Sequence, residues 1–221
     1  MKLLSINIGR ERQQQRKDYV ETTGIYKLPV DGPVEIKSLG IEGDAICDKK
    51  NHGGPDQALY IYGGADYAWW EGELGKQLAP GTFGDNLTIS GLESAVFNVG
   101  DYLLIGEVTL QITSPRIPCG TFATRMSDPQ WVKKFRAAER PGLYVRVIKE
   151  GVIKAGDPVT IEKYSGETVS IVQMYRDHYD KDHGEELLRQ YLNSPIDIRS
   201  RVSFEEELQK LTAPKIHASD S

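Results

Sequence analysis

Glycine and proline interrupt the first three quarters of the chain too often for long helices to form there. The 221 residues include 22 glycines and 11 prolines, so glycine is clearly above its usual share of about 7%. Short segments between glycine turns are typical of strands. Such segments occur at residues 3–8, 34–38, 58–62, 102–105, 108–112 and 143–148. We therefore predict a β-rich domain over residues 1–165.

Two of these segments are followed closely by another apolar run, which predicts hairpins. Gly106-Glu107 separates residues 102–105 from 108–112, and residues 149–151 separate 143–148 from 152–154. Helices are few in this domain. One is expected over residues 67–78, and another after Pro129, where three apolar side chains recur at helical spacing, namely Trp131, Phe135 and Ala138.

The pattern changes near Gly166. Apolar residues at helical spacing predict three short helices over residues 166–212, the last with a capping box at Ser203-Phe-Glu-Glu206. Residues 213–221 are expected to be a disordered tail. Three short helices bury little apolar surface alone, so they should pack on the β-rich domain or on a second subunit, which makes a homodimer an option.

Composition excludes several classes of protein. With 27 Lys and Arg against 32 Asp and Glu, the chain carries a formal net charge of −5, which disfavours a nucleic-acid polymer as partner. No apolar run approaches the roughly 20 residues that span a membrane, and the N-terminus does not resemble a signal peptide. Two cysteines, Cys47 and Cys119, are too few for a disulfide scaffold or a four-cysteine zinc site. We expect a soluble, cytoplasmic protein.

The densest polar, turn-rich segment runs from Lys49 to Gln57. Its Gly53-Gly54 pair forces a tight turn and leaves backbone amides free to face an anion, while Lys50 and His52 add positive charge. The segment is a candidate cradle for phosphate. A solvated loop with a hydrogen-bonding histidine is the alternative.

A second candidate follows the predicted strand at 108–112. In Ser114-Pro-Arg-Ile-Pro-Cys-Gly120, two prolines stiffen the chain around Arg116 and Cys119. A thiolate beside an arginine has a lowered pKa and suits a soft metal or a nucleophilic role. Alternatively, Cys119 is a small buried hydrophobe. Cys47 lacks these flanks and is interpreted as structural.

Two further polar stretches have weaker signals. Asp85 and Asn86 follow a glycine turn, where they would bind a ligand or satisfy their own turn. The acidic and histidine-rich stretch 177–183 suggests a metal site, but its place between two predicted helices favours a solvated loop. All the motifs that favour chemistry therefore lie within residues 1–165.

The order of four separated motifs resembles the MOSC domain, named after the C-terminal part of molybdenum-cofactor sulfurase. The motifs are Gly40-Ile-Glu-Gly-Asp44, His52-Gly-Gly-Pro-Asp-Gln-Ala-Leu-Tyr60, Phe83-Gly-Asp-Asn-Leu-Thr88 and Pro115-Arg-Ile-Pro-Cys119. The helical segment after residue 165 is similar to that of the YiiM subgroup of the family, and Thr23–Val30 also fits that subgroup.

The resemblance implies a β-barrel that binds the molybdenum cofactor, Mo-molybdopterin. It implies Cys119 as molybdenum ligand and catalytic residue, and His52 as catalytic and cofactor-binding residue. It further implies cofactor-binding roles for basic and polar residues of the motifs, namely Lys27, Lys50, Arg116, Asp85 and Asn86. Position 85 departs from the family pattern, because Asp replaces the usual Glu. The implied activity is reduction of N-hydroxylated compounds such as 6-N-hydroxylaminopurine, with electrons from a separate reductase.

Two other functions use the same residues differently. A non-catalytic carrier would hold the molybdenum cofactor or a persulfide on Cys119. An interaction domain without ligand would keep Cys119 in its core. Metal content separates the last from the others, and turnover with a reductase separates the first two.

Overall fold

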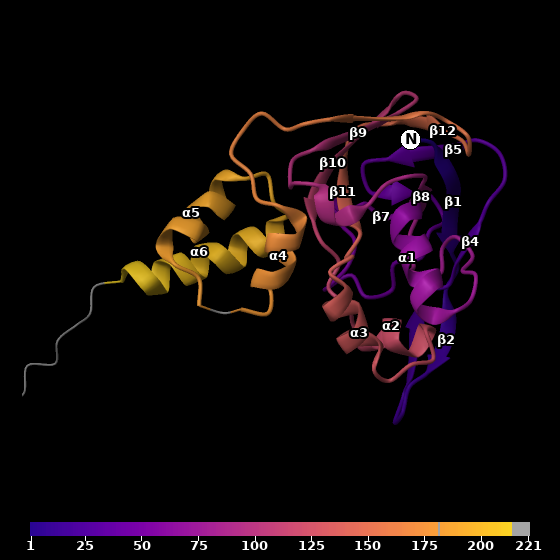
Figure 1. Ribbon diagram of the computed structural model, residues 1–221, viewed down its shortest axis with the longest axis horizontal. Helices are drawn as coiled ribbons and strands as arrows, with labels where there is room; N and C mark the ends of the chain where they lie inside the picture. Colours follow the sequence, from indigo (N-terminus) through magenta and orange to yellow (C-terminus); the bar gives the residue numbers. More distant parts are fainter. Residues whose placement is uncertain (181, 214–221) are drawn as a thin grey trace, which may run out of the picture.

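The computed structural model describes residues 1–180 and 182–213. Its main element is an eight-stranded sheet in the order β13-β9-β10-β11-β7-β8-β1-β4 (Figure 1). Neighbouring strands are antiparallel except β7 and β8, which are parallel. The strand bounds are β1 Leu3–Gly9, β4 Lys27–Pro29, β7 Leu59–Gly63, β8 Leu87–Ile89, β9 Tyr102–Ile105, β10 Val108–Ser114, β11 Leu143–Lys149 and β13 Val159–Glu162.

The sheet curls until its edge strand β13 meets the beginning of β1. The Leu3 amide donates to the Asp157 carbonyl at 2.9 Å, and the Val159 amide donates to the Met1 carbonyl at 3.0 Å. Apolar side chains from the strands fill the inside, because alternate residues of a strand point to one face. This core includes Leu3, Ile6, Ile61, Leu87, Leu103, Leu110, Ile112 and Val145.

Two smaller sheets complete the β structure. β5 (Val34–Lys37) lies between β6 (Gly40–Ile41) and β12 (Gly151–Ile153), and β2 (Arg12–Gln15) pairs with β3 (Val20–Thr23). The predicted hairpin at Gly106 is confirmed, since Ile105 pairs with Val108. The second predicted hairpin is wrong: β12 pairs with β5, because β10 and β7 already occupy both edges of β11.

Three helices pack around a second core of aromatic residues. They are α1 (Gly64–Leu74), α2 (Gly120–Arg125) and α3 (Trp131–Ala138). The core beneath them contains Tyr60, Tyr62, Tyr67, Trp70, Phe83, Phe122, Trp131, Phe135 and Tyr144. The predicted bounds 67–78 for the first helix are wrong. It ends before Gly75, whose φ of 62° lies in the left-handed region that glycine adopts at helix ends.

The C-terminal part forms three helices, α4 (Ile171–Asp177), α5 (Glu185–Asn193) and α6 (Ile198–Thr212), which we call the helical region. They pack beside one another next to the β9–β11 side of the sheet (Figure 1). The predicted capping box is wrong, because Ser203 lies inside α6. Asp197 caps that helix by accepting from the Arg199 and Ser200 amides at 3.1 and 3.2 Å.

The prediction of a mainly β fold with a few short helices and three C-terminal helices is confirmed. The predicted tail lies outside the described residues from position 214 onward. No helix in the described part of the chain has the length and apolar character needed to span a membrane.

Candidate functional site

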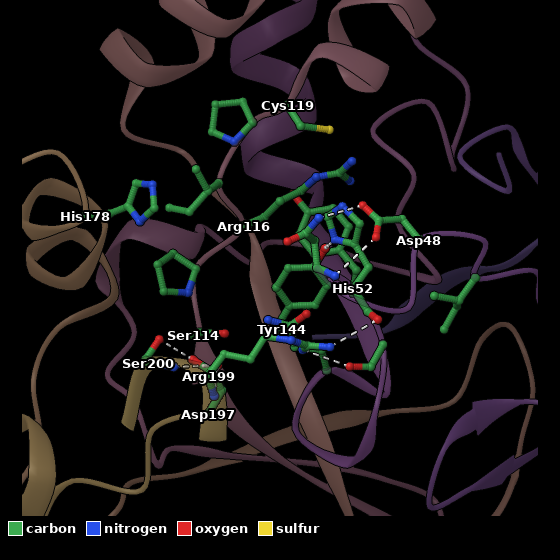
Figure 2. A pocket seen from close by; sticks show the side chains of 18 of the residues that line it. Asp48, His52, Ser114, Arg116, Cys119, Tyr144, His178, Asp197, Arg199 and Ser200 are labelled. Carbon is green, nitrogen blue, oxygen red and sulfur yellow. Dashed lines mark hydrogen bonds between the residues drawn. The ribbon is translucent and has the colours of Figure 1, made fainter. Parts of the chain in front are cut away.

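A cavity of about 940 Å³ lies between the sheet and the helical region. One wall comes from the loops that carry the sequence motifs, including Lys27, His52, Asn86, Arg116 and Cys119. The other comes from α4–α6 and the turns between them, including Asp177, His178, His183, Arg199 and Glu207. Figure 2 shows side chains from both walls. The helical region therefore lines the cavity together with the motif loops, whereas the assignment of all chemical motifs to residues 1–165 stays a prediction.

Cys119 lies at the junction between β10 and α2, where it is the residue before the first helical turn. Pro115 and Pro118 fix the backbone that leads to it. Its side chain is half-buried and lines the cavity. Burial raises the pKa of the Cys119 thiol, but a hydrogen bond with His52, the charge of Arg116 and the Phe122 amide outweigh burial and bring the pKa to about 6. The thiolate therefore predominates at neutral pH.

His52 joins the thiol to the aromatic core. Its Nδ1 atom lies 3.3 Å from the Tyr144 hydroxyl, and the ring lies close enough to Cys119 to lower the pKa of that thiol. It belongs to an irregular loop that the His52 amide stabilises by donating to the Asp48 carbonyl at 2.9 Å. Figure 2 shows His52 between Asp48 and Tyr144. The predicted contribution of His52 to a basic site is consistent with this placement.

Arg116 is buried beneath the cavity. Its guanidinium carbon lies 4.8 Å from the Tyr60 ring centroid and 4.4 Å from that of Phe122, so the cation is sandwiched by aromatic faces. One terminal nitrogen donates to the Phe83 carbonyl. The buried Nε atom has no hydrogen-bond partner within residues 1–180 and 182–213. A ligand or a water bound in the cavity would supply the acceptor that this buried donor lacks.

Lys27 and Asn86 both contact the carboxylate of Asp44, to which the sequence analysis gave no role. The Lys27 ammonium contacts both carboxylate oxygens of Asp44. Asn86 Nδ2 and the Gly9 amide donate to the same carboxylate at 2.9 and 2.8 Å. Burial lowers the pKa of Lys27 and the Asp44 charge opposes this shift. The basic charge predicted for the cofactor is thus partly neutralised by Asp44.

Two predicted cofactor residues do not line the cavity. Asp85 is fully buried behind it, where its carboxylate accepts from Tyr67 Oη at 2.7 Å and Thr88 Oγ1 at 2.6 Å. Burial raises the pKa of Asp85. It therefore holds the neighbouring turn and does not face the cavity. Lys50 is exposed on the loop beside His52 and also lies outside the lining.

Cys47 and the stretch 177–183 also lie at the cavity, and the solvated loop expected for this stretch is wrong for Asp177 and His183. Cys47 lines the same cavity, and burial raises its pKa. Asp177 and His183 are not solvated. Asp177 accepts from Tyr191 Oη at 2.6 Å, and His183 Nδ1 lies 3.0 Å from the Glu207 carboxylate. The described residues contain no group of three or more His, Cys, Asp or Glu side chains that would hold a metal ion.

The sequence analysis gave Asp44 no role, and it interpreted the stretch 177–183 of the helical wall as a solvated loop. Asp44 ends the first motif, Gly40-Ile-Glu-Gly-Asp44, and an acidic residue directly after a glycine was an available signal. Arg199 and Glu207 of the helical wall left no such signal, because they line the cavity only when α4–α6 pack on the sheet.

Comparison with known proteins identifies a matching family, relatives in sequence and a similar solved structure. A family model described as the MOSC domain matches residues 48–160. The uncharacterized protein YflK of Bacillus subtilis is 34% identical over 154 residues, which cover 70% of each chain. A protein named "Reductase" from Gibberella moniliformis is 29% identical over 163 residues, which cover 72% of this chain and 29% of that one. The crystal structure of YiiM from Geobacillus stearothermophilus superposes with a TM-score of 0.75 at 26% identity, covering 94% of this chain and 98% of that one.

Proposed function

Because the chain belongs to the MOSC domain family, we propose that it is a molybdenum-cofactor-dependent oxidoreductase that reduces N-hydroxylated compounds. The single observation that carries the proposal is the Cys119 thiol, which lines a large cavity and has a pKa of about 6. A relative named "Reductase" agrees with a redox role. We propose 6-N-hydroxylaminopurine and related base analogues as substrates.

The residues of the cavity fit the cofactor. A thiolate is the soft ligand that molybdenum prefers, and Cys119 would hold the metal. Arg116 keeps a buried Nε donor without a partner, and Ser114 keeps a buried hydroxyl in the same state within the described chain. Both line the cavity, where they suit the polar groups of the pterin and its phosphate. When bound, the cofactor supplies the two-electron chemistry.

The residues around the thiolate have separate roles. Reduction of R–NHOH to R–NH₂ and water consumes two electrons and two protons. His52 lies between Tyr144 and Cys119, where its ring can hold a proton beside the reacting group. Arg116 keeps the thiolate charged from its buried position. Two cysteines are too few for an iron–sulfur cluster with four thiolate ligands, so we propose that a separate reductase supplies the electrons.

The second candidate is a carrier of the cofactor or of a persulfide on Cys119. The same low pKa favours it, because sulfur transfer requires a thiolate. It predicts bound cofactor or sulfane sulfur without turnover. A cytoplasmic location and a homodimer stay predictions.

The test is metal and pterin analysis, followed by turnover, of protein produced in a host that makes the cofactor. The wild-type chain should contain molybdenum and, with a flavin reductase as donor, should convert 6-N-hydroxylaminopurine to adenine. Cys119→Ala should lose both properties, while Cys47→Ala, which changes the other cysteine of the cavity, should keep them. Bound cofactor without turnover would favour the carrier. Molybdenum retained by Cys119→Ala would contradict the proposed ligand.

A further inference from the structure

We propose that His183 is a pH-sensitive clamp between α4 and α6, two helices that line the cavity. In its doubly protonated form the ring holds the end of α4 against α6, and loss of one ring proton releases that hold. The inference concerns the acidic and histidine-rich stretch 177–183, which the proposed function does not use. It depends neither on the cofactor nor on Cys119.

Both ring nitrogens of His183 face groups that only accept hydrogen bonds. Nδ1 lies 3.0 Å from each carboxylate oxygen of Glu207 on α6. Nε2 lies 3.0 Å from the backbone carbonyl of Asp177, the last residue of α4. A neutral imidazole has one N–H donor and one acceptor nitrogen, so it satisfies only one of these two partners. The geometry therefore fits the imidazolium ion, which donates from both nitrogens.

The ring lies between the two helices, away from water. The His183 side chain is 7% exposed, whereas that of Glu207 is 32% exposed. The Phe204 ring of α6 meets the imidazole edge-on, with centroids 5.6 Å apart. Because the imidazole is buried, water does not replace the hydrogen bond that deprotonation breaks, and a buried polar atom is left without a partner.

The charges around the ring favour the cation. Glu207 pairs with it directly, and the ring lies at the C-terminal end of α4, where the helix dipole is negative. Burial lowers the pKa of His183, but the hydrogen bonds with Glu207 and with the Asp177 carbonyl and the charges of both carboxylates outweigh burial and raise this pKa. The Asp177 carboxylate is itself held by Tyr191 Oη of α5 at 2.6 Å. The other charged groups nearby are Asp182 and Lys210, which line a hollow with the ring, and Glu185 at the start of α5, which pairs with Arg189.

Deprotonation of His183 should loosen the helical wall as the pH rises. A group whose pKa is higher in the folded chain stabilises the fold while it is protonated, and this contribution is lost as the pH rises through the folded-state midpoint. The second half of α6 should respond most. None of the residues of α6 is buried, and its first turn is held separately, because the Ile198 amide donates to Asp56 Oδ2 at 2.8 Å.

The first test follows the imidazole ring of His183 by heteronuclear NMR as the pH is raised. It uses the full chain, purified from a host that makes no molybdopterin, and the nitrogen shifts distinguish the imidazolium ion from either neutral tautomer. The ring should be an imidazolium ion below a midpoint that is higher than the ordinary histidine value of 6.5. A midpoint at or below 6.5 would overturn the proposal.

Glu206→Gln is the matched control for Glu207→Gln. Both variants remove one negative charge from neighbouring positions of α6, and both residues line the cavity. Of the two, only Glu207 hydrogen-bonds the ring in the described chain. Glu207→Gln should therefore lower the midpoint of His183, and Glu206→Gln should leave it unchanged. Equal midpoints in the two variants would contradict the clamp, because the net charge of the helix would then explain the titration.

Backbone hydrogen exchange shows whether the ring controls the wall. Exchange is measured over residues 203–212 and corrected for its intrinsic dependence on pH. Protection should fall as the pH rises through the His183 midpoint, by about tenfold for each pH unit that separates this midpoint from the ordinary value of 6.5. Glu206→Gln should keep this fall, and His183→Gln should abolish it.

Two results of the exchange experiment would overturn the proposal. One is protection that stays constant while His183 titrates, and the other is a fall that persists in His183→Gln. Circular dichroism melting checks that each variant folds. If His183→Gln does not fold, the wild-type midpoint, the wild-type exchange profile and the two glutamate variants still decide the question.

Discussion

Replacing Asp44 by alanine should destabilise the protein far more than replacing its partner Lys27 by methionine. The two side chains form a buried ion pair, with side-chain exposures of 4% and 8%. The two partners differ, however, in how many other hydrogen-bonding groups each one contacts. Lys27 depends on Asp44, whereas the Asp44 carboxylate also accepts hydrogen bonds from the Gly9 amide and Asn86.

The contacts allow an order-of-magnitude estimate for each variant. Asp44→Ala leaves a buried ammonium and two N–H donors without an acceptor. Breaking a buried pair costs about 3–5 kcal/mol, and an unsatisfied donor adds about 1–3 kcal/mol. Loss of the Lys27 proton limits this cost, since burial already lowers the pKa of Lys27. Lys27→Met leaves a carboxylate that keeps two donors, so we expect about 1–3 kcal/mol.

Urea denaturation followed by circular dichroism measures both free energies of unfolding, and equal m values show that the comparison is valid. A loss in Lys27→Met as large as that in Asp44→Ala would refute the reasoning, because the other two donors would then not compensate the carboxylate. Molybdenum content gives a second result. Since Asp44 engages the Lys27 ammonium, Lys27→Met should retain most of the bound cofactor, whereas a direct phosphate contact predicts its loss.

Three further predictions concern the thiolate and the helical region. The Cys119 thiol has its ordinary pKa of 9.0 in the unfolded chain and a pKa of about 6 in the folded chain. The unfolding free energy of wild type, minus that of Cys119→Ala, should therefore increase as the pH rises from 6 to 9. This difference should be lost as the pH falls through 6. A difference that is flat with pH in urea titrations would contradict the lowered pKa. Arg116→Lys should reduce cofactor content despite its retained charge, since the sandwiched planar cation is lost; wild-type molybdenum content would disprove that role. Truncation after Lys163 should expose the sheet surface and lower cofactor content per folded chain, and a soluble truncated protein with full molybdenum content would show that the helical wall is dispensable.

Local patterns predicted the elements whose partners are also local. Strands at 102–105 and 108–112 were predicted with their hairpin, because the two-residue connection leaves them one way to pair. The helix after Pro129 was predicted because its apolar stripe faces one core. The pairing of β12 with β5 was not predictable in this way. Its partner lies more than a hundred residues earlier, and the choice depends on both edges of β11 being occupied.

The same distinction applies to the site. The placement of Cys119 and Arg116 after a strand end was predicted, because prolines fix both within one short segment; their roles stay predictions. The partner of Lys27 and the burial of Asp177 depend on tertiary contacts. Asp177 illustrates the difficulty: its carboxylate stands in a charged stretch that is typical of a solvated loop, yet Tyr191 and Gln173 satisfy it in the interior of the helical region. Burial of a carboxylate depends on the donors brought to it, and these are not visible in the local sequence.

The two side chains that lower the pKa of Cys119, Arg116 and His52, lie on segments that differ in how regular their backbone structure is. Arg116 lies next to the thiol on a segment fixed by prolines, and therefore acts in a geometry that local structure secures. His52 has the larger effect on the pKa of the thiol but belongs to a glycine-rich loop without regular structure. Arg199 of the last helix donates hydrogen bonds to the backbone of this loop, so the loop and α6 are connected directly. The helical region therefore does more than cover apolar surface, because it also contacts the loop that carries His52.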